Sequence, residues 1–379
     1  MRTTILSLDE TTSYVSALSE AAAALRNGAL VVFPTETVYG VAANAADPAA
    51  VARLRQVKQR RDDKPFTVHL AGRADAGKYV RSSAPVARRF ARKAWAGPLT
   101  LVCDTPDPRE TEIAEACPPE QLDQIFHKGT VGLRCPDHPD AARLIAEAGV
   151  PVVASSANRA GSAPPLDAAG ALRELDGAVE FVIDAGRTRL SKPSTVVRVS
   201  GGGWRIERPG AIEKRTLDRM ARSEILFVCT GNSCRSPLAE YLYRDRLGRR
   251  LGLSPEALER AGYRVSSAGT FAARGGSASQ GTLDELARRG IDGRGHRAQP
   301  LTVDLIQRVE RIYALAAEHR EIVLDLSPGA ATRVAWLDES GSVPDPIGGG
   351  PDEYARCAEQ IERAVDQRLE VFLDEDCHW

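Results

Sequence analysis

The stretch Ile225-Leu-Phe-Val-Cys-Thr-Gly-Asn-Ser-Cys-Arg-Ser-Pro237 decides the fold of the second half of the chain. Its four leading apolar residues predict a buried strand. A short polar loop follows, and Pro237 then favours the start of a helix, because proline is well accommodated in the first helical turn. A strand, a loop and a helix in this order predict an α/β domain whose site lies where the strand ends.

The loop itself has the residues of a phosphate site with a nucleophile. Five residues separate Cys229 from Arg235, enough to direct backbone N–H groups at one phosphate, while the guanidinium offers a planar fork for two phosphate oxygens. The N-terminus of the next helix adds positive potential, which we expect to bind the anion and to lower the thiol pKa. A thiolate beneath a phosphate is a nucleophile, and Asp345 in the Val343–Gly350 loop suits a general acid.

Strands and helices also alternate through the first half. Ala29–Phe33 and Phe66–Leu70 read as strands, Asp47 caps a helix that starts at Pro48, and Val196–Val199 with Trp204–Glu207 reads as a hairpin. The pattern predicts an α/β layer architecture. A charged segment at 211–224 then precedes the new strand. We therefore predict two domains, residues 1–212 and residues 223–379.

Composition narrows the class of protein. The 379 residues are 43% hydrophobic and 27% charged, which is typical of a soluble globular protein and not of a membrane protein. Residues 1–212 carry 27 Lys and Arg against 24 Asp and Glu, and the remainder carry 23 against 27, so neither half has the charge of a dedicated nucleic-acid binder. Seven scattered cysteines without a CxxC pair argue for the cytoplasm and against both a disulfide framework and a zinc site.

Small hydroxyls and cations follow the strands of the first half. The motifs are, in chain order, Pro34-Thr-Glu-Thr-Val-Tyr-Gly40, Lys58-Gln-Arg60, His69 at a strand end, Trp95-Ala-Gly-Pro-Leu-Thr100, Thr130-Val-Gly-Leu-Arg134, Ser155-Ser-Ala-Asn158, Ser194-Thr195 and Arg208-Pro-Gly210. Such groups suit a triphosphate and a carboxylate. Taken singly, each motif also fits a structural role. Gly72–Lys78 nearly spells a phosphate-binding P-loop, but Tyr79 stands where Ser or Thr must hold magnesium, so we predict a turn there.

Together and in this order, the motifs resemble the YrdC-like threonylcarbamoyl-AMP synthase family over about residues 5–212. The resemblance implies L-threonine, bicarbonate and ATP with magnesium as substrates, and partner proteins that transfer the threonylcarbamoyl group to tRNA. It implies a twisted open α/β sheet. It also implies a threonine site of Thr35, His69, Arg134 and Ser194. It implies an ATP site of Lys58, Arg60, Thr130, Ser156, Asn158 and Arg208. The family usually has proline where this chain has Arg61, which bears on the shape of that loop.

The second half resembles the low-molecular-weight protein-tyrosine-phosphatase family over about residues 223–373. The resemblance rests on the Cys229 loop, Ser267-Ala-Gly-Thr270, His296 and Asp345 in that order. It implies a Rossmann-like parallel sheet, a cysteinyl-phosphate intermediate without a cofactor, and a phosphoprotein substrate. By position, Cys229 is the nucleophile, Arg235 binds the phosphate and Asp345 is the general acid.

The same resemblance implies a supporting shell and a redox partner. The shell comprises Asn232, Ser233, Ser236, Ser267 and His296. His296 fits a structural role equally well. Cys234 is placed to form a reversible disulfide with Cys229.

The substrate is less narrowly defined. Tyrosine phosphatases of the family usually carry a bulky aliphatic residue at the position of Ser233 and tyrosines after Asp-Pro, whereas this chain has Ile347-Gly-Gly-Gly350. Phosphoarginine-selective members carry threonine at the Ser233 position, so the sequence favours phosphoarginine, with a tyrosine phosphatase as the alternative. A further alternative, a nucleic-acid-binding first half that regulates the phosphatase, fits poorly with its weak charge and few aromatics.

Overall fold

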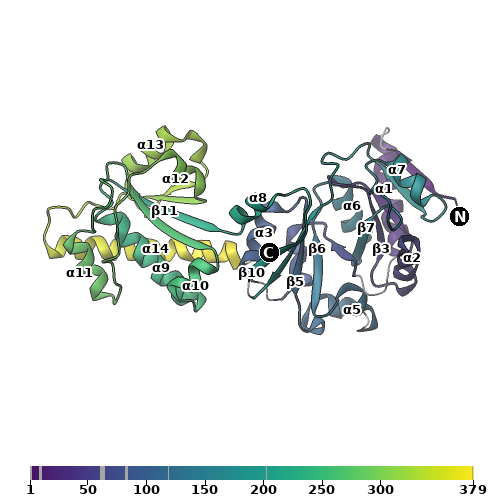
Figure 1. Cartoon of the computed structure of the whole chain (residues 1–379), viewed down its shortest axis with the longest axis horizontal. Helices are drawn as coiled ribbons and strands as arrows, with labels where there is room; N and C mark the ends of the chain where they lie inside the picture. Colours follow the sequence, from purple (N-terminus) through teal and green to yellow (C-terminus); the bar gives the residue numbers. More distant parts are fainter. Residues whose placement is uncertain are drawn as a thin grey trace. The chain divides into compact units, whose positions relative to one another are not determined.

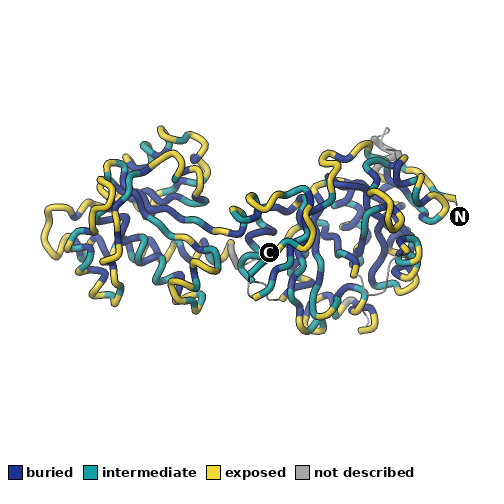
Figure 2. The backbone as a smooth tube through the Cα atoms, in the orientation of Figure 1, coloured by how far each residue is buried: buried dark blue, intermediate teal, exposed yellow. Residues whose placement is uncertain are grey.

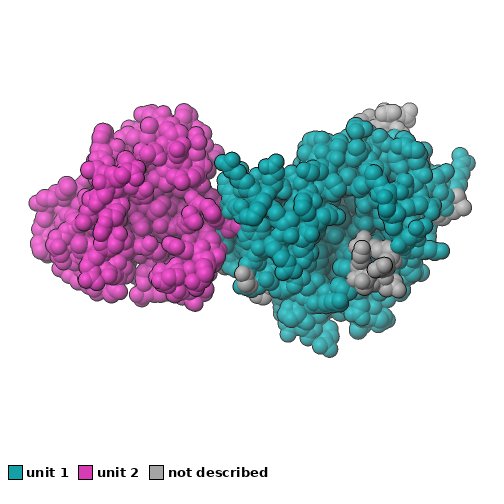
Figure 3. Space-filling view, viewed as in Figure 1, with its two compact units in different colours: residues 1–220, 378–379 teal, residues 221–377 magenta. Residues whose placement is uncertain are grey.

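The computed structural model describes residues 2–7, 11–59, 65–81, 84–117, 119–201, 203–377 and 379. The chain divides into two compact units, one of residues 1–220 with 378–379 and one of residues 221–377 (Figure 3). Both units are α/β, as the alternating pattern predicted. Among the described residues, no helix is both long enough and apolar enough to span a membrane.

Unit 1 is built on one mixed sheet in the order β1-β8-β2-β3-β7-β4-β6-β5-β9-β10. Its strands are β1 Thr4–Ser7, β2 Val31–Phe33, β3 Gly40–Asn44, β4 Thr67–His69, β5 Leu99–Asp104, β6 Thr130–Arg134, β7 Val152–Ser156, β8 Phe181–Asp184, β9 Thr195–Ser200 and β10 Gly203–Arg208. Its helices are α1 Thr11–Arg26, α2 Pro48–Lys58, η1 Arg73–Lys78, α3 Pro85–Ala94, η2 Pro108–Glu110, α4 Ile113–Ala116, α5 Pro119–Ile125, α6 Pro139–Ala148, α7 Ala168–Leu175 and α8 Lys214–Met220.

Local signals account for several of these elements. Asp47 accepts hydrogen bonds from the N–H groups of Ala49 and Ala50, so it caps α2 as predicted. The predicted hairpin is the antiparallel pair β9 and β10. The predicted turn at Gly72–Tyr79 is the 3₁₀ helix η1. The sequence missed α8, because only Leu217 of that short helix is buried and it lacks an apolar stripe.

Unit 2 has a four-stranded sheet in the order β12-β11-β13-β14, in which all pairs are parallel. Its strands are β11 Ser223–Cys229, β12 Tyr263–Gly269, β13 Arg311–Ala314 and β14 Val334–Trp336. Its helices are α9 Arg235–Leu251, α10 Pro255–Arg260, α11 Gln280–Arg288, α12 Val303–Arg308, α13 Ala317–Leu326, η3 Pro328–Ala330 and α14 Pro351–Cys377. The parallel sheet agrees with the resemblance.

The central strand β11 is buried on both faces, and this explains its unbroken apolar run (Figure 2). Ile225 and Phe227 join the core formed with α9 and α14, whereas Leu226 and Val228 join the core formed with α12 and α13. The helices accordingly cover both faces of the sheet (Figure 1). Cys229 ends this strand, so the reactive thiol stands at the rigid carboxyl edge of the sheet.

Candidate active sites

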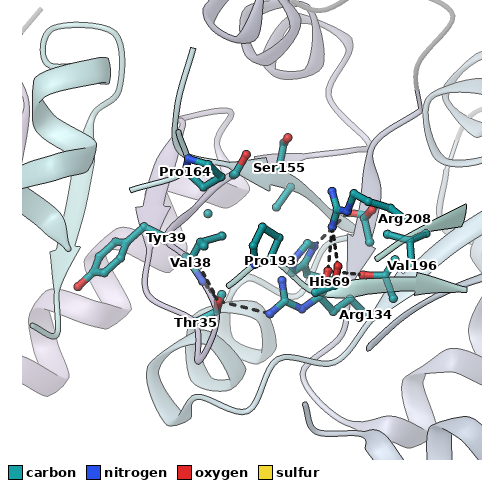
Figure 4. A pocket seen from close by; sticks show the side chains of 16 residues that line it. Thr35, Val38, Tyr39, His69, Arg134, Ser155, Pro164, Pro193, Val196 and Arg208 are labelled. Carbon is teal, nitrogen blue, oxygen red and sulfur yellow. Dashed lines mark hydrogen bonds between the residues drawn. The ribbon is translucent and has the colours of Figure 1, made fainter. Parts of the chain in front are cut away.

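Unit 1 contains a cavity of about 150 Å³ at the middle of its sheet (Figure 4). Six residues of the predicted sites line it: Thr35, His69, Arg134, Ser156, Ser194 and Arg208. Strand register explains why these residues lie together, because His69 of β4 and Thr100 of β5 both pair with Arg134 of β6. The whole predicted threonine site therefore lies around one cavity, together with two of the residues predicted for ATP.

Arg134 is the central cation of this cavity. Its Nη2 atom donates to Glu36 at 3.0 Å and to Thr37 at 2.5 Å, and the exposed fractions of the Arg134 and Glu36 side chains are 7% and 1%. Burial lowers the pKa of Arg134, and the Glu36 carboxylate acts against that shift. The buried Nε atom of Arg134 has no partner among the described residues. Since a buried donor without a partner is costly, this guanidinium is suited to receive an anion.

His69 and Arg208 complete the polar lining. Burial and the charge of Arg134 lower the pKa of His69 to about 3, so the imidazole is neutral. Its Nδ1 atom lies 3.1 Å from the carbonyl oxygen of Thr67, which assigns the ring proton to Nδ1 and leaves Nε2 as an acceptor. Arg208 donates to the backbone oxygen of Ser194 at 2.9 Å and to its hydroxyl at 3.2 Å. Burial, followed by the charge of Arg134, lowers the pKa of Arg208.

The glycine of the Arg208-Pro-Gly210 motif has a steric reason. A Cβ atom on Gly210 would lie 2.4 Å from backbone atoms of Ser194 and Thr195. Glycine therefore permits the chain after Arg208 to approach the start of β9 and brings Arg208 to Ser194.

Lys58 joins a second group of predicted residues. The ammonium of this buried side chain donates to the backbone oxygens of Ser156 and Asn158 and lies 3.2 Å from the Asn158 amide oxygen. The Ser156 hydroxyl donates to the same amide oxygen at 2.5 Å. Lys58, Ser156 and Asn158 therefore form one cluster, and Ser156 links it to the cavity.

Two residues predicted for ATP are not in these clusters. Thr130 begins β6, four residues from Arg134 and so about 13 Å away along the strand. Its hydroxyl donates to the His127 oxygen at 2.8 Å, and it does not line the cavity. Arg60 lies outside the described residues, as does Arg61. The roles of Thr130 and Arg60 stay predictions.

The site of unit 2 is centred on the Cys229–Arg235 loop. The helix α9 begins at Arg235, two residues before the predicted start at Pro237. The Cys229 sulfur lies 2.9 Å from the Ser236 hydroxyl and accepts from the Asn232 N–H at 3.3 Å. Asn232 has a φ of +53°, a left-handed conformation that turns the loop back toward the sulfur.

A hydrogen-bond network holds Asn232 in that conformation. Its amide nitrogen donates to Ser236 at 2.9 Å and to Ser267 at 2.8 Å, and His296 lies 2.8 Å from its backbone oxygen. Ser267 in turn donates to Glu240 at 2.6 Å. Asn232 and three other residues of the predicted shell thus form one network, which favours a loop-positioning role for His296. Ser233 lies outside this network, and its backbone oxygen accepts from Ser279.

Arg235 and Asp345 meet directly. The distance between Arg235 Nη2 and Asp345 Oδ2 is 2.5 Å, and Nη1 donates to the Val343 oxygen at 3.1 Å. The Arg235 side chain is 5% exposed, whereas that of Asp345 is 36% exposed. The buried Nε atom of Arg235 has no partner among the described residues. The structure thus brings the predicted phosphate ligand and the predicted acid to one place.

Cys229 and Cys234 are both free thiols. Burial raises the pKa of Cys229, while hydrogen bonds from Ser236 and Asn232 and the charge of Arg235 act against the rise. The expected lowering of this pKa is therefore wrong for this structure, because burial outweighs the loop's donors. Cys234 lies 3.3 Å from the Ser279 hydroxyl and 3.5 Å from the Tyr354 hydroxyl. A Cys229–Cys234 disulfide stays a prediction.

Sequence reasoning missed several partners of the predicted residues. Glu36 lies inside the quoted Pro34–Gly40 motif, so its position in that motif could have identified it as a site residue. Glu240 and His319 had no local signal, because they meet Ser267 and Thr230 only through the tertiary fold. Gly269 of the Ser267–Thr270 motif is explained by packing, since a Cβ there would lie 2.4 Å from the Thr230 oxygen and 2.8 Å from the Asn232 nitrogen.

Each unit of the chain matches a known protein family. A family model described as "Telomere recombination", for Sua5, YciO and YrdC proteins, matches residues 23–210. A putative threonylcarbamoyl-AMP synthase of Mycobacterium tuberculosis is 38% identical over 197 residues, which cover 52% of this chain and 85% of that protein. The threonylcarbamoyl-AMP synthase of Bacillus subtilis is 34% identical over 212 residues, or 55% of this chain, and the match spans only 58% of that protein.

A second family model, for low molecular weight phosphotyrosine protein phosphatases, matches residues 224–376. The protein-arginine-phosphatase of Bacillus subtilis is 32% identical over 149 residues, which cover 38% of this chain and 93% of that protein. The chain therefore belongs to the Sua5, YciO and YrdC family through its first unit and to the low-molecular-weight phosphatase family through its second.

Proposed function

We propose that unit 1 makes threonylcarbamoyl-AMP from L-threonine, bicarbonate and ATP, and that unit 2 hydrolyses a phosphorylated protein side chain, with phosphoarginine favoured. The names of the matched relatives support both activities. For unit 1, the observation that carries the proposal is the buried Arg134, which lines a cavity of about 150 Å³ and whose Nε atom has no partner among the described residues. The product would then serve tRNA modification through separate transfer proteins.

Unit 1 would act by positioning its substrates. The threonine carboxylate would bind Arg134, and the neutral His69 would accept a hydrogen bond through Nε2. The threonine amine attacks bicarbonate, water leaves, and a carbamate forms. A carbamate oxygen then attacks the α-phosphorus of ATP, the bond to the β-phosphate breaks, and pyrophosphate leaves. Lys58 and Arg208 would offset the negative charge, with magnesium entering as part of the ATP substrate.

Unit 2 would act through a covalent intermediate. The Cys229 thiol would first lose its proton, which an oxygen of the bound phosphate dianion can accept. The thiolate then attacks phosphorus, the bond to the leaving atom breaks, and protonated Asp345 gives that atom a proton. Water then attacks the cysteinyl phosphate, Asp345 takes a proton from the water, the S–P bond breaks to return the thiolate, and inorganic phosphate leaves. Arg235 would hold the phosphoryl oxygens through its unpartnered Nε atom.

The proposed substrate preference rests on Ser233, whose small hydroxyl would leave polar room near the thiol for a guanidinium. An alternative, a tyrosine phosphatase, is favoured by one observation. Phe271 is 79% exposed, and its N–H donates to the Thr230 oxygen, so the backbone of an exposed aromatic residue lies next to the loop. Such a residue suits the ring of a phosphotyrosine.

The test measures kcat/KM for phosphoarginine and phosphotyrosine peptides with wild type and Ser233→Ile. We expect wild type to prefer phosphoarginine and the substitution to move the ratio toward phosphotyrosine by about 10- to 200-fold, the range for one group in a pocket. A wild-type preference for phosphotyrosine would favour the alternative. For unit 1, formation of threonylcarbamoyl-AMP and pyrophosphate from the three substrates is the direct assay.

A further inference from the structure

The buried imidazole of His319 lies beside the phosphatase loop without any role in the mechanism above. His319 is the third residue of α13, and its exposed fraction is 0%. Its Nε2 atom lies 2.9 Å from the Thr230 hydroxyl, and Thr230 directly follows the nucleophile Cys229. The same hydroxyl accepts a hydrogen bond from Arg235 Nη2 at 3.2 Å. One hydroxyl oxygen thus joins the imidazole to the phosphate-binding guanidinium.

We propose that His319 is a positioning residue for Arg235, acting through the Thr230 hydroxyl. The proposal rests on the phosphatase function proposed for unit 2. Its physical basis is the way in which the N–H donors of the Arg235 guanidinium are distributed among their acceptors. Nη1 is held by the Val343 oxygen, and Nη2 is shared between Thr230 and Asp345. Nε has no partner among the described residues.

Catalysis removes one of these contacts. Asp345 must turn to the leaving group in order to protonate it, so its hydrogen bond to Nη2 is lost at that moment. Only the contacts to Val343 and Thr230 then orient the guanidinium while its Nε and Nη2 donors face the phosphoryl oxygens. Val343 is itself fixed, because its N–H donates to the Leu315 oxygen at 2.8 Å. The Thr230 backbone oxygen accepts from the Phe271 N–H, but among the described residues the Thr230 hydroxyl is joined only to His319 and Arg235.

The protonation state of His319 fits this role. Burial, followed by the charge of Arg235, lowers its pKa to about 4, while Glu318 and Asp345 act against the shift. The imidazole is therefore neutral at pH 7 and does not repel the guanidinium. Because Arg235 can only donate, the Thr230 oxygen accepts from it with either imidazole tautomer. This chain of hydrogen bonds from His319 through Thr230 to Arg235, called the relay below, therefore does not depend on which ring nitrogen carries the proton.

The experiment uses the full chain and two readouts, kcat/KM for an aryl phosphate and the dissociation constant of inorganic phosphate from titration calorimetry. His319→Leu removes the hydrogen bond while keeping an apolar volume. We expect kcat/KM to fall and the dissociation constant of phosphate to rise by about three- to tenfold, the size of one neutral hydrogen bond. His319→Gln, which can place an amide near the former Nε2 position, should recover most of the loss.

A double-mutant cycle separates the relay from a packing effect. In a Thr230→Val background, His319→Leu should cause no further change in phosphate affinity, because the link is already broken. Val323→Ala is the matched control, since Val323 lies four residues further along α13 and is fully buried. It should lower the melting temperature and leave phosphate affinity unchanged.

Two results would overturn the proposal: independent, multiplying effects of the two substitutions, or a His319→Gln variant as impaired as His319→Leu. A wild type that hydrolyses neither aryl phosphates nor phosphoarginine would instead contradict the phosphatase function. Phosphate affinities would still decide whether the relay exists.

Discussion

Removing the Glu36 carboxylate should destabilise unit 1 far more than its surface ion pairs do. In Glu36→Ala, the buried Arg134 loses the carboxylate that now lies 3.0 Å from its Nη2 atom. The backbone N–H of Asp137, which donates to the other carboxylate oxygen at 3.1 Å, loses its acceptor as well. Because both side chains are more than nine-tenths buried, water cannot readily replace the lost partner of the guanidinium.

The magnitude follows from this burial. Breaking a buried ion pair by removing one partner costs about 3–5 kcal/mol. For a domain of about 220 residues, each kcal/mol lowers the melting temperature by about 2–4 °C, which predicts a decrease of about 6–20 °C. Glu36→Gln should lie between wild type and Glu36→Ala, since it loses the charge but keeps a hydrogen-bond acceptor for Arg134.

The assay is calorimetric unfolding of the full chain, following the transition that ATP and threonine shift, because two units need not unfold together. The control is Arg189→Ala, which breaks the neighbouring pair of Arg189 with Asp137, whose side chains are 65% and 49% exposed. That exposed pair is worth about 0–1 kcal/mol. A Glu36→Ala variant that melts no lower than Arg189→Ala would refute the burial argument.

Three further predictions concern the two activities and pH. Lys58→Ala should abolish threonylcarbamoyl-AMP synthesis and leave phosphatase turnover unchanged; full synthase rates in this variant would contradict the cation's role. Asp345→Asn should slow hydrolysis most for poor leaving groups, because these need the proton most, and equal rate losses across a series of aryl phosphates would count against a general acid. The folded pKa of His69 is about 3 against 6.5, so between these values the unfolded chain binds more protons. The stability of unit 1 should therefore fall as pH drops from 6.5, by up to about 1.4 kcal/mol per pH unit, and denaturant titrations of His69→Gln should lack this slope.

Much of the architecture was accessible from local sequence. The apolar run before Cys229 predicted a strand, and Asp47 with Pro48 predicted the start of a helix, because both signals depend on neighbouring residues. The predicted start of α9 was wrong by two residues. The loop turns back to Cys229 through the Asn232 N–H, so it ends before Pro237 and the helix begins at Arg235. The helix α8 was missed for lack of an apolar stripe.

The two sites also depend partly on the local sequence and partly on the tertiary structure. The sequence by itself determined which residue types are present: a cysteine and an arginine in one loop, and cations and hydroxyls at strand ends. Which of them meet was decided by strand register, which sets His69 beside Arg134 and leaves Thr130 about 13 Å from it along β6. Tertiary structure also decided the protonation states. The pKa of Cys229 is raised and that of His69 lowered because burial disfavours the charged form of each, and burial depends on chain segments far apart in the sequence.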